Sequence, residues 1–211
     1  MKSEKTRFFI AGTDTNVGKT VIAAGLVHAL GSTYFKPVQS GTTESDDSET
    51  VRQLAALTPE RILSPVYRFS APLSPHEAAM EAGTMIEPER IQLPDVPGAL
   101  VVEGAGGLFV PLTDNCYMLD IMARFGLPVV LVARSTLGTI NHTLLSVVAL
   151  QQRGLTLAAV ILNGANQPET ERFLREQLAP VPVIGIPQYA QLTRHAMQDI
   201  AERLKIITTA V

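Results

Sequence analysis

Residues 8–30 read FFIAGTDTNVGKTVIAAGLVHAL, and this stretch decides how the rest of the sequence is interpreted. A short apolar strand ends at Gly12, the chain turns, and Gly18-Lys19-Thr20 opens a long apolar helix. The first N–H groups of a helix have no partner within the helix and attract anions. The pattern predicts a phosphate-binding loop in which Lys19 reaches the terminal phosphates and the Thr20 hydroxyl binds Mg²⁺.

The spacing of this loop departs from the usual pattern by one residue. Five residues separate Gly12 from Gly18 instead of four, so Thr13 stands where the first glycine is common. An ordinary strand-to-helix turn with a surface lysine is the alternative, but it does not explain why a glycine, a lysine and a hydroxyl fall together at the helix start. The predicted nucleotide contacts of the loop are Asn16, Val17, Gly18, Lys19, Thr20 and Val21.

Further apolar runs predict the fold class. Short apolar runs, rich in Val, Ile and Leu except at 33–35, occur at 33–35, 100–102, 127–133, 157–162 and 183–187. They alternate with helical patterns, among them 143–152, 168–178 and 192–204. Such continuous runs are typical of strands buried on both faces. We therefore expect an α/β protein with a doubly wound, mainly parallel sheet and helices on both faces. No repeat or composition break appears, so residues 1–211 are predicted to form a single domain.

The segment 58–98 is rich in proline, which interrupts long elements. We expect loops and short helices there, including a helix at 76–82. Such a stretch often covers a substrate, although it could equally be a plain connection between elements.

Bulk composition excludes several functions. The 211 residues carry a net charge of −3, no tryptophan and no run of Lys or Arg, which argues against nucleic acid or anionic membrane as a partner. The polar start leads into a short apolar strand, and no apolar run approaches the roughly 20 residues of a membrane span. The single cysteine, Cys116, excludes an internal disulfide and fits a reducing compartment, so we expect a cytoplasmic protein.

Polar residues follow two of the predicted strands. Lys36 and Ser40 come after the strand at 33–35, and in open α/β sheets ligands bind beyond the carboxyl ends of the strands. A solvated lysine before a proline turn is an equally good interpretation at this point. Asp46 and Asp47 precede a helical pattern, where an aspartate could cap the helix or bind magnesium. Position alone does not decide between these roles.

Glu103 follows the predicted strand 100–102 and precedes three glycines within residues 104–107. The glycines allow the backbone to approach a ligand closely, while the carboxylate can hold a metal ion or its water. Thr139 and Asn141 precede the helix predicted at 143–152 and could simply cap it.

Four motifs in this order closely resemble those of the dethiobiotin synthetases, a family of P-loop enzymes. They are GTDTNVGKT at 12–20, KPVQSG at 36–41, VEGAGG at 102–107 and LGTINH at 137–142. The match spans nearly the whole chain, and the family shares the longer loop spacing. The resemblance implies a P-loop NTPase-like fold and ATP-dependent carboxylation and ring closure of 7,8-diaminopelargonic acid with CO₂. The products are dethiobiotin, ADP and phosphate, formed through a carbamate and a carbamoyl-phosphate-type intermediate.

The resemblance also implies partners and residue roles. ATP is the co-substrate, Mg²⁺ is the cofactor, and the protein is a homodimer whose active site is shared across the interface. Lys19 and Lys36 match the catalytic cations, and Thr20, Asp47 and Glu103 match the metal ligands, with Asp47 fitting better than Asp46. The matching substrate contacts are Thr13, Ser40, Gly106, Gly107, Leu108, Thr139 and Asn141. The matching nucleotide contacts beyond the loop and the metal site are Asn163, Gly164, Pro187, Gln188 and Tyr189.

Three departures from the family pattern stand out. Asn16 replaces a common acidic residue, Gly164 stands where an aspartate is frequent, and Leu108 replaces a common aromatic residue. The first two affect nucleotide contacts, so the preference for ATP over other nucleotides is left open. The main alternative is a ParA/MinD-like switch ATPase that acts by binding partners. Those proteins carry a second lysine early in the loop, and residues 11–17 contain none. A second alternative, an amide-forming ligase of the cobyrinate type, needs an appended glutaminase domain for which the chain is too short.

Overall fold

The computed structural model describes residues 6–43, 46–164 and 167–209. Its centre is a seven-stranded sheet of order β11-β10-β9-β1-β6-β2-β4, in which every neighbouring pair is parallel. The strands are β1 (Arg7–Gly12), β2 (Thr33–Phe35), β4 (Ile62–Leu63), β6 (Leu100–Gly107), β9 (Val129–Arg134), β10 (Leu157–Asn163) and β11 (Val183–Ile186). The predicted parallel sheet is therefore confirmed.

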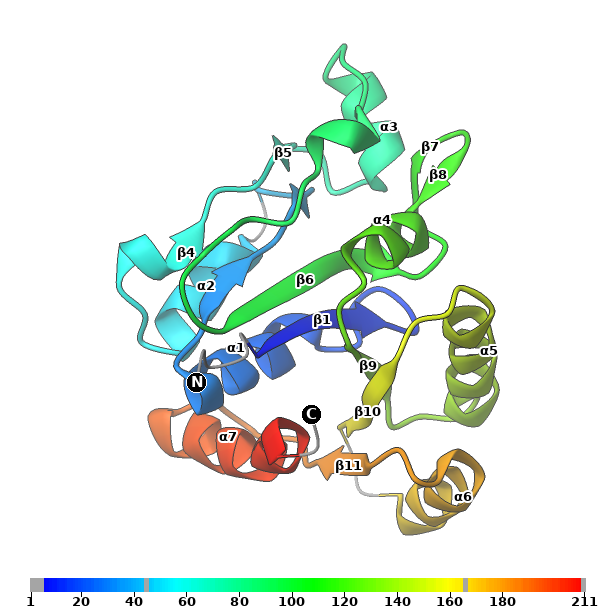
Figure 1. Cartoon of the computed structure of the whole chain (residues 1–211). Coiled ribbons are helices and arrows are strands. Elements are labelled where there is room, and N and C mark those ends of the chain that lie inside the picture. The colour runs from blue at the N-terminus through cyan, green and yellow to red at the C-terminus, as the bar shows by residue number, and fades with distance from the viewer. Residues whose placement is uncertain (1–5, 44–45, 165–166, 210–211) are drawn as a thin grey trace.

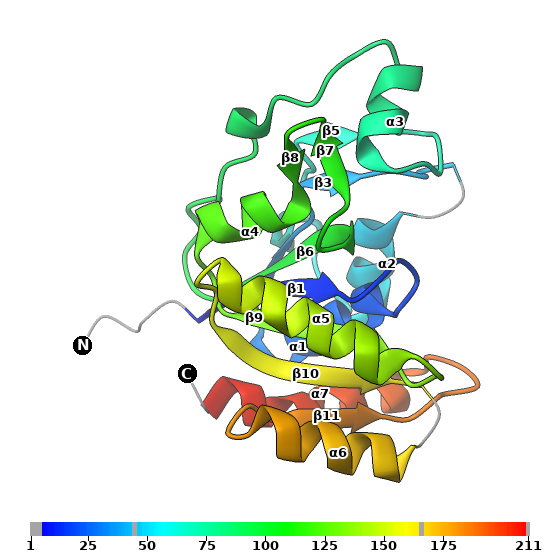
Figure 2. The ribbon, with the colours of Figure 1, turned by 90° about the vertical axis from the view of Figure 1, so that its right-hand side faces the viewer.

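Helices cover both faces of this sheet (Figures 1 and 2). One face carries α1 (Lys19–Leu30), α2 (Asp47–Leu54) and α7 (Arg194–Thr209), and the other carries α4 (Met118–Phe125), α5 (Thr139–Gln152) and α6 (Pro168–Leu178). None of these helices, within the residues described, is long and apolar enough to cross a membrane. The doubly wound arrangement is confirmed.

The central strands are apolar throughout because both of their faces are buried. In β1, Phe8 and Ile10 pack into the cluster that includes α1 and α7, whereas Phe9 and Ala11 pack into the cluster that includes α4 and α5. All four side chains are almost inaccessible to solvent. Since successive side chains of a strand point to opposite faces, one continuous apolar run serves both layers.

The proline-rich segment builds the region next to the carboxyl ends of β2 and β6. It contains the 3₁₀ helices η1 (Pro59–Arg61) and η2 (Pro88–Arg90), the strands β4 and β5 (Tyr67–Arg68), and the helix α3 (Pro75–Glu81). The short strand β5 pairs with β3 (Val38–Gln39). Helix α3 packs against β7 (Pro111–Thr113). Strand β7 forms a hairpin with β8 (Cys116–Tyr117) beyond the carboxyl end of β6 (Figure 1). Short helices occur in this segment, with α3 at Pro75–Glu81 where 76–82 was expected, and its strands were not predicted.

Several predicted boundaries are wrong, and two of them bear on the site. Strand β6 does not end at residue 102 but continues through its glycines to Gly107. Glycine is favoured there because a Cβ atom at Gly104 would lie 3.0 Å from the ring of Phe9 on the neighbouring strand, a tighter contact than side chains normally make. Helix α5 begins at Thr139 rather than at residue 143, with Gly138 as its N-cap in the left-handed conformation. Helix α4 was not predicted at all.

Candidate active site

The phosphate-binding loop, residues 13–18, joins β1 to α1. Gly18 has φ of 94°, a left-handed value that glycine adopts without strain. A Cβ atom there would lie 2.0 Å from Nδ2 of Asn163. That same amide donates a 3.0 Å hydrogen bond to the carbonyl of Val17. The end of β10 therefore holds the last turn of the loop, and only glycine fits beside it.

The start of α1 is suited to an anion. No acidic residue lies in its first turn, and among the described residues no side chain caps its N-terminus. Lys19 is buried and donates a 3.1 Å hydrogen bond to the carbonyl of Asp14, so it crosses the loop. Burial and the neighbouring charge of Lys36 lower the pKa of Lys19 to about 8. A phosphate in the loop would favour the charged form of this lysine.

Four side chains from four separate elements meet beside the loop. Nζ of Lys36, just beyond β2, lies 2.7 Å from Oδ2 of Asp47 and 3.0 Å from Oε1 of Glu103. The Thr20 hydroxyl lies 2.9 Å from Oδ1 of Asp47 and 3.0 Å from the same Glu103 oxygen. We call these residues, Thr20, Lys36, Asp47 and Glu103, the charge cluster. The carboxyl end of β2 and the middle of β6, together with the starts of α1 and α2, bring them together.

Burial and the mutual attraction of opposite charges compete in this cluster. Lys36 is 4% exposed and Glu103 is 0% exposed. Burial opposes the Lys36 ammonium, but the two carboxylates outweigh it and raise the pKa of Lys36. Burial likewise opposes ionisation of Asp47, but Lys36 outweighs it and lowers the pKa of Asp47. Burial and the charge of Glu103 raise the pKa of Tyr34 well above its ordinary value, so its hydroxyl keeps its proton.

The two neighbouring aspartates have different partners. Asp46 caps α2 by accepting hydrogen bonds from the backbone N–H groups of Ser48 and Glu49, and it pairs with Arg68 at 2.7 Å. Asp47 instead points into the charge cluster. The capping role left open by the sequence thus belongs to Asp46. Metal binding by Asp47 stays a prediction.

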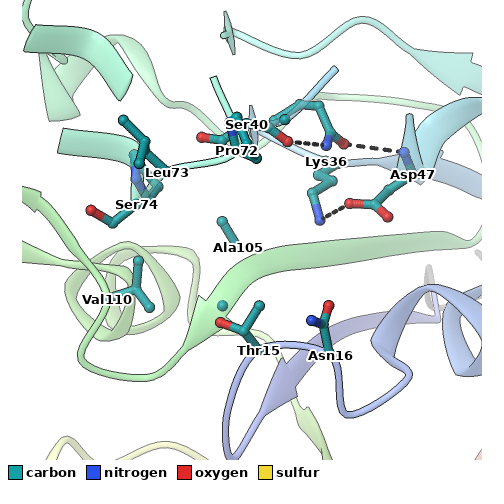
Figure 3. A pocket seen from close by; sticks show the side chains of 14 residues that line it. Thr15, Asn16, Lys36, Ser40, Asp47, Pro72, Leu73, Ser74, Ala105 and Val110 are labelled. Atoms are coloured by element: carbon teal, nitrogen blue, oxygen red, sulfur yellow. Dashed lines mark hydrogen bonds and ion pairs between the residues drawn. The ribbon is translucent and has the colours of Figure 1, made fainter. Parts of the chain in front are cut away.

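Two adjoining cavities meet at the charge cluster. The Ser40 cavity, of about 400 Å³, is also lined by Gln39, Ser40, Gly41, Ala105, Val110 and residues 72–75. The phosphate-loop cavity, of about 330 Å³, is also lined by Gly18, Lys19, Thr20 and Glu103. The residues common to both are Thr15, Asn16, Lys36, Asp47 and Gly106. In Figure 3, Lys36 and Asp47 face Thr15 and Asn16 across this space, with Ser40 and Pro72 beyond.

The predicted nucleotide contacts at the far end of the sheet are only partly brought together. The Gly164 cavity, of about 270 Å³, lies at the carboxyl ends of β9, β10 and β11 and includes Gly164 and Pro187 in its lining. Gln188 is exposed, and the Tyr189 hydroxyl donates to Asp199 of α7. Neither of these two side chains lines the cavity.

The predicted substrate contacts fall into three places. Ser40 and Gly106 line the Ser40 cavity. Three others, Thr13, Gly107 and Leu108, line a separate Leu145 cavity of about 620 Å³, with Leu145 and Val148 of α5 on its opposite wall.

Thr139 and Asn141 line none of these four cavities within a single chain. No side chain of the described residues caps α5, so the capping interpretation of Thr139 and Asn141 is wrong. The Thr139 hydroxyl is buried and finds no hydrogen-bond partner among the described residues, whereas Asn141 is exposed.

Sequence reasoning missed two residues beside the charge cluster. Thr15 lines both cavities that meet there. The buried Gln39 amide donates a 2.8 Å bond to the carbonyl of Ser40 and accepts a 3.3 Å bond from the backbone N–H of Asp47. Thr15 lies inside the quoted loop motif and could have been chosen there. Nothing in the sequence around Gln39 points to its role.

A sequence family described as "AAA domain" matches residues 6–196. The ATP-dependent dethiobiotin synthetase BioD of Rhodopseudomonas palustris is 47% identical over 193 residues, covering 92% of this chain and 91% of that protein. The protein of the same name from Agrobacterium fabrum gives the same values. The crystal structure of the cell division ATPase MinD from Pyrococcus furiosus has a TM-score of 0.57 at 15% identity, covering 97% of this chain and 100% of that one. At that identity the structural likeness shows the fold alone.

Proposed function

The chain belongs to the family of ATP-dependent dethiobiotin synthetases, and we propose that it converts 7,8-diaminopelargonic acid, CO₂ and ATP into dethiobiotin, ADP and phosphate. Sequence identity of 47% extends over nine-tenths of both this chain and its relatives. The reaction needs a nucleotide site and a diamine site that share one reacting centre.

The observation that carries this proposal is the position of Lys36. Its side chain lies on the wall of the phosphate-loop cavity and of the Ser40 cavity. The first cavity contains the features of a phosphate site, namely Lys19, Thr20 and the start of α1. The second contains Ser40, whose buried hydroxyl finds no hydrogen-bond partner among the described residues. A cation between the two can contact both the γ-phosphate and a group bound beside Ser40.

The proposed chemistry has three steps. One amine of the substrate attacks CO₂ to form a carbamate, with loss of a proton. A carbamate oxygen then attacks the γ-phosphorus of ATP, and the bond to the β-phosphate oxygen breaks to release ADP. The second amine attacks the carbamoyl carbon, loses a proton and expels phosphate, which closes the ureido ring.

The protein contributes positioning and positive charge to these steps, because phosphoryl transfer requires little else from an enzyme. Lys36 stays protonated, since the carboxylates around it raise its pKa. Its ammonium bridges the carbamate and the transferring phosphoryl group, where negative charge develops. Lys19 contacts the phosphates from the other side, and Thr15 lies between the two cavities.

The residues of the charge cluster fit Mg²⁺. Mg²⁺ is usually held by one or two carboxylates, other oxygen ligands, waters and substrate phosphates. The Thr20 hydroxyl lies within 3.0 Å of oxygens of both Asp47 and Glu103. The described residues contain no group of three or more His, Cys, Asp and Glu side chains that could hold a metal ion, so waters and the nucleotide phosphates would have to complete the coordination. Bound there, Mg²⁺ would neutralise charge on the phosphates.

The base of the nucleotide is assigned to the Gly164 cavity. Asn163 connects this cavity to the phosphate loop, because its amide holds the carbonyl of Val17 while its backbone belongs to β10. Pro187 supplies an apolar wall. A nucleotide whose phosphates occupy the loop can extend along the carboxyl ends of β1, β9 and β10 to this position.

A homodimer is part of the proposal. Leu137, before α5, and Leu145 and Val148 of α5 are exposed by 103%, 61% and 48%. Phe109, which lines the Leu145 cavity with Leu145 and Val148, is exposed by 59%. An exposed apolar surface of this kind commonly marks a protein interface. In a dimer through this surface, the start of α5 with Asn141 can reach the partner's Ser40 cavity and bind the carboxylate of the diamine there.

The switch-ATPase alternative receives less support. The likeness to MinD is one of fold, at 15% identity, and residues 11–17 contain no second lysine. We also propose a cytoplasmic location, in keeping with the single cysteine.

Measurement of ADP formation with and without the other substrates tests the proposal. We expect ADP formation to require the diamine and bicarbonate together. ATP turnover that is independent of the diamine would favour the switch ATPase.

A further inference from the structure

Tyr34 lies in the middle of β2, and no part of it is exposed to solvent. Its ring packs in the apolar cluster shared with α1 and α2. Its hydroxyl donates a 2.8 Å hydrogen bond to Oε2 of Glu103, which is equally buried. A tyrosine placed only to fill the core would not need this bond, since phenylalanine has nearly the same shape.

The bond divides the two oxygens of Glu103 between different partners. Oε2 accepts from Tyr34 on the buried side. Oε1 accepts from Lys36 and from the Thr20 hydroxyl, each at 3.0 Å, and both of these residues line the phosphate-loop cavity. A metal ion bound next to Thr20 therefore meets a single oxygen of Glu103.

Chelation through both oxygens would require the carboxylate to turn away from Tyr34. The turned carboxylate would leave a buried hydroxyl without an acceptor, and such unpaired groups are costly. Ca²⁺ takes six to eight oxygen ligands and often binds a carboxylate through both oxygens, whereas Mg²⁺ demands compact octahedral geometry. An anchored carboxylate thus suits the smaller ion.

We propose that Tyr34 is a positioning residue that restricts Glu103 to one-oxygen coordination and so favours Mg²⁺ over Ca²⁺ at this site. The inference rests on the proposed function only for the presence of a metal–nucleotide complex in the loop. It adds a specificity-determining residue on β2, outside the four motifs.

The test uses Tyr34→Phe, which removes the hydroxyl and keeps the ring. Its matched control is Tyr67→Phe, which removes another buried tyrosine hydroxyl whose hydrogen bonds go to the backbone of Glu87, away from the site. Calorimetry would give the affinities for the ATP analogue AMPPNP with Mg²⁺, with Ca²⁺ and with a chelator. We expect Tyr34→Phe to lower the ratio of Mg²⁺-complex to Ca²⁺-complex affinity by about tenfold. Tyr67→Phe should leave the ratio unchanged, and neither variant should alter metal-free binding.

An unchanged ratio in a cooperatively melting Tyr34→Phe protein would overturn the proposal. The proposal would also be overturned if Tyr34→Phe weakened AMPPNP binding in the chelator as much as in Mg²⁺, because that would indicate a distorted loop. If the variant does not fold, a crystal structure of the unchanged protein with Mg²⁺ and AMPPNP decides. Only Oε1 of Glu103 should contact the ion, and contact through both oxygens contradicts us. None of these measurements requires the diamine, so failure of dethiobiotin synthesis would leave their outcome readable.

Discussion

Nζ of Lys36, just beyond β2, lies 2.7 Å from Oδ2 of Asp47, the first residue of α2. Both side chains also line the two cavities that meet at this point. The ion pair therefore fixes a cation at the junction between the proposed nucleotide and diamine sites. The cation is nearly buried, since Lys36 is 4% exposed.

Replacement of Lys36 by alanine should reduce kcat far more than the affinity for ATP. Its contact with the transferring phosphoryl group should strengthen in the transition state, so we expect kcat to fall about 100-fold or more. Steady-state kinetics gives kcat, and calorimetric titration with AMPPNP gives the nucleotide affinity. Lys205→Ala, at an exposed lysine paired with Glu202, is the control for loss of a charge. Parallel losses of kcat and ATP affinity would exclude the bridging role, provided that the variant melts like the parent.

The two adjacent aspartates should separate in their response to alanine. Asp47→Ala should weaken binding of the Mg²⁺–AMPPNP complex by at least about tenfold, because it removes a carboxylate of the proposed metal site. Asp46→Ala should destabilise the protein by about 1 kcal/mol through loss of the α2 cap and leave Mg²⁺ dependence unchanged. Calorimetric titration and thermal melting measure the two effects. A larger Mg²⁺ effect from Asp46 than from Asp47 would contradict the assignment.

Alanine at Gly18 should weaken nucleotide binding because its Cβ atom collides with Asn163. Gly83→Ala is the matched control, since Gly83 also has a positive φ, of 67°, but no atom lies within 4 Å of its added Cβ. Both variants carry backbone strain, and only Gly18→Ala displaces the amide that holds the loop. We expect AMPPNP affinity to fall about tenfold in Gly18→Ala alone. Equal affinities in the two variants would show that Asn163 does not hold the loop for nucleotide binding.

A shared active site should allow two inactive variants to complement each other. Lys36→Ala and Asn141→Ala change residues that belong, in the proposed dimer, to the same site on different subunits. After mixing and exchange of subunits, half of the dimers are hybrids with one intact site, so we expect recovery to about a quarter of parental activity. Mass spectrometry would verify that hybrids form. Hybrids without activity would place both residues in one chain's site.

The sequence predicted the fold more completely than it predicted the site. The continuous apolar runs of β1, β9 and β10 are long enough to identify buried parallel strands. Helix α4 was not predicted, because its eight residues directly follow the β7–β8 hairpin and show the helical spacing of apolar residues over only about two turns. The continuation of β6 beyond residue 102 was not predicted, because glycine normally argues against a strand. The close approach of Phe9 to Gly104, which favours glycine there, is known only from the structure.

The site depends on distances that a linear pattern does not contain. Lys36, Asp47 and Glu103 could be grouped only through a family resemblance, and their roles remain predictions. The structure adds that they share hydrogen bonds, and that Asp46 and Asp47 face different partners. The hydrogen bond from Tyr34 to Glu103 could not be predicted, because a tyrosine in a short apolar strand is most simply interpreted as a core residue.

The most direct test of the proposed reaction is formation of the product itself. Purified protein is incubated with 7,8-diaminopelargonate, ¹³C-bicarbonate, Mg²⁺ and ATP, and dethiobiotin and ADP are measured by mass spectrometry. We expect dethiobiotin that carries the label in its ureido carbon, with ADP formed in equal amount. Absence of labelled dethiobiotin from a protein that binds ATP normally would contradict the assignment.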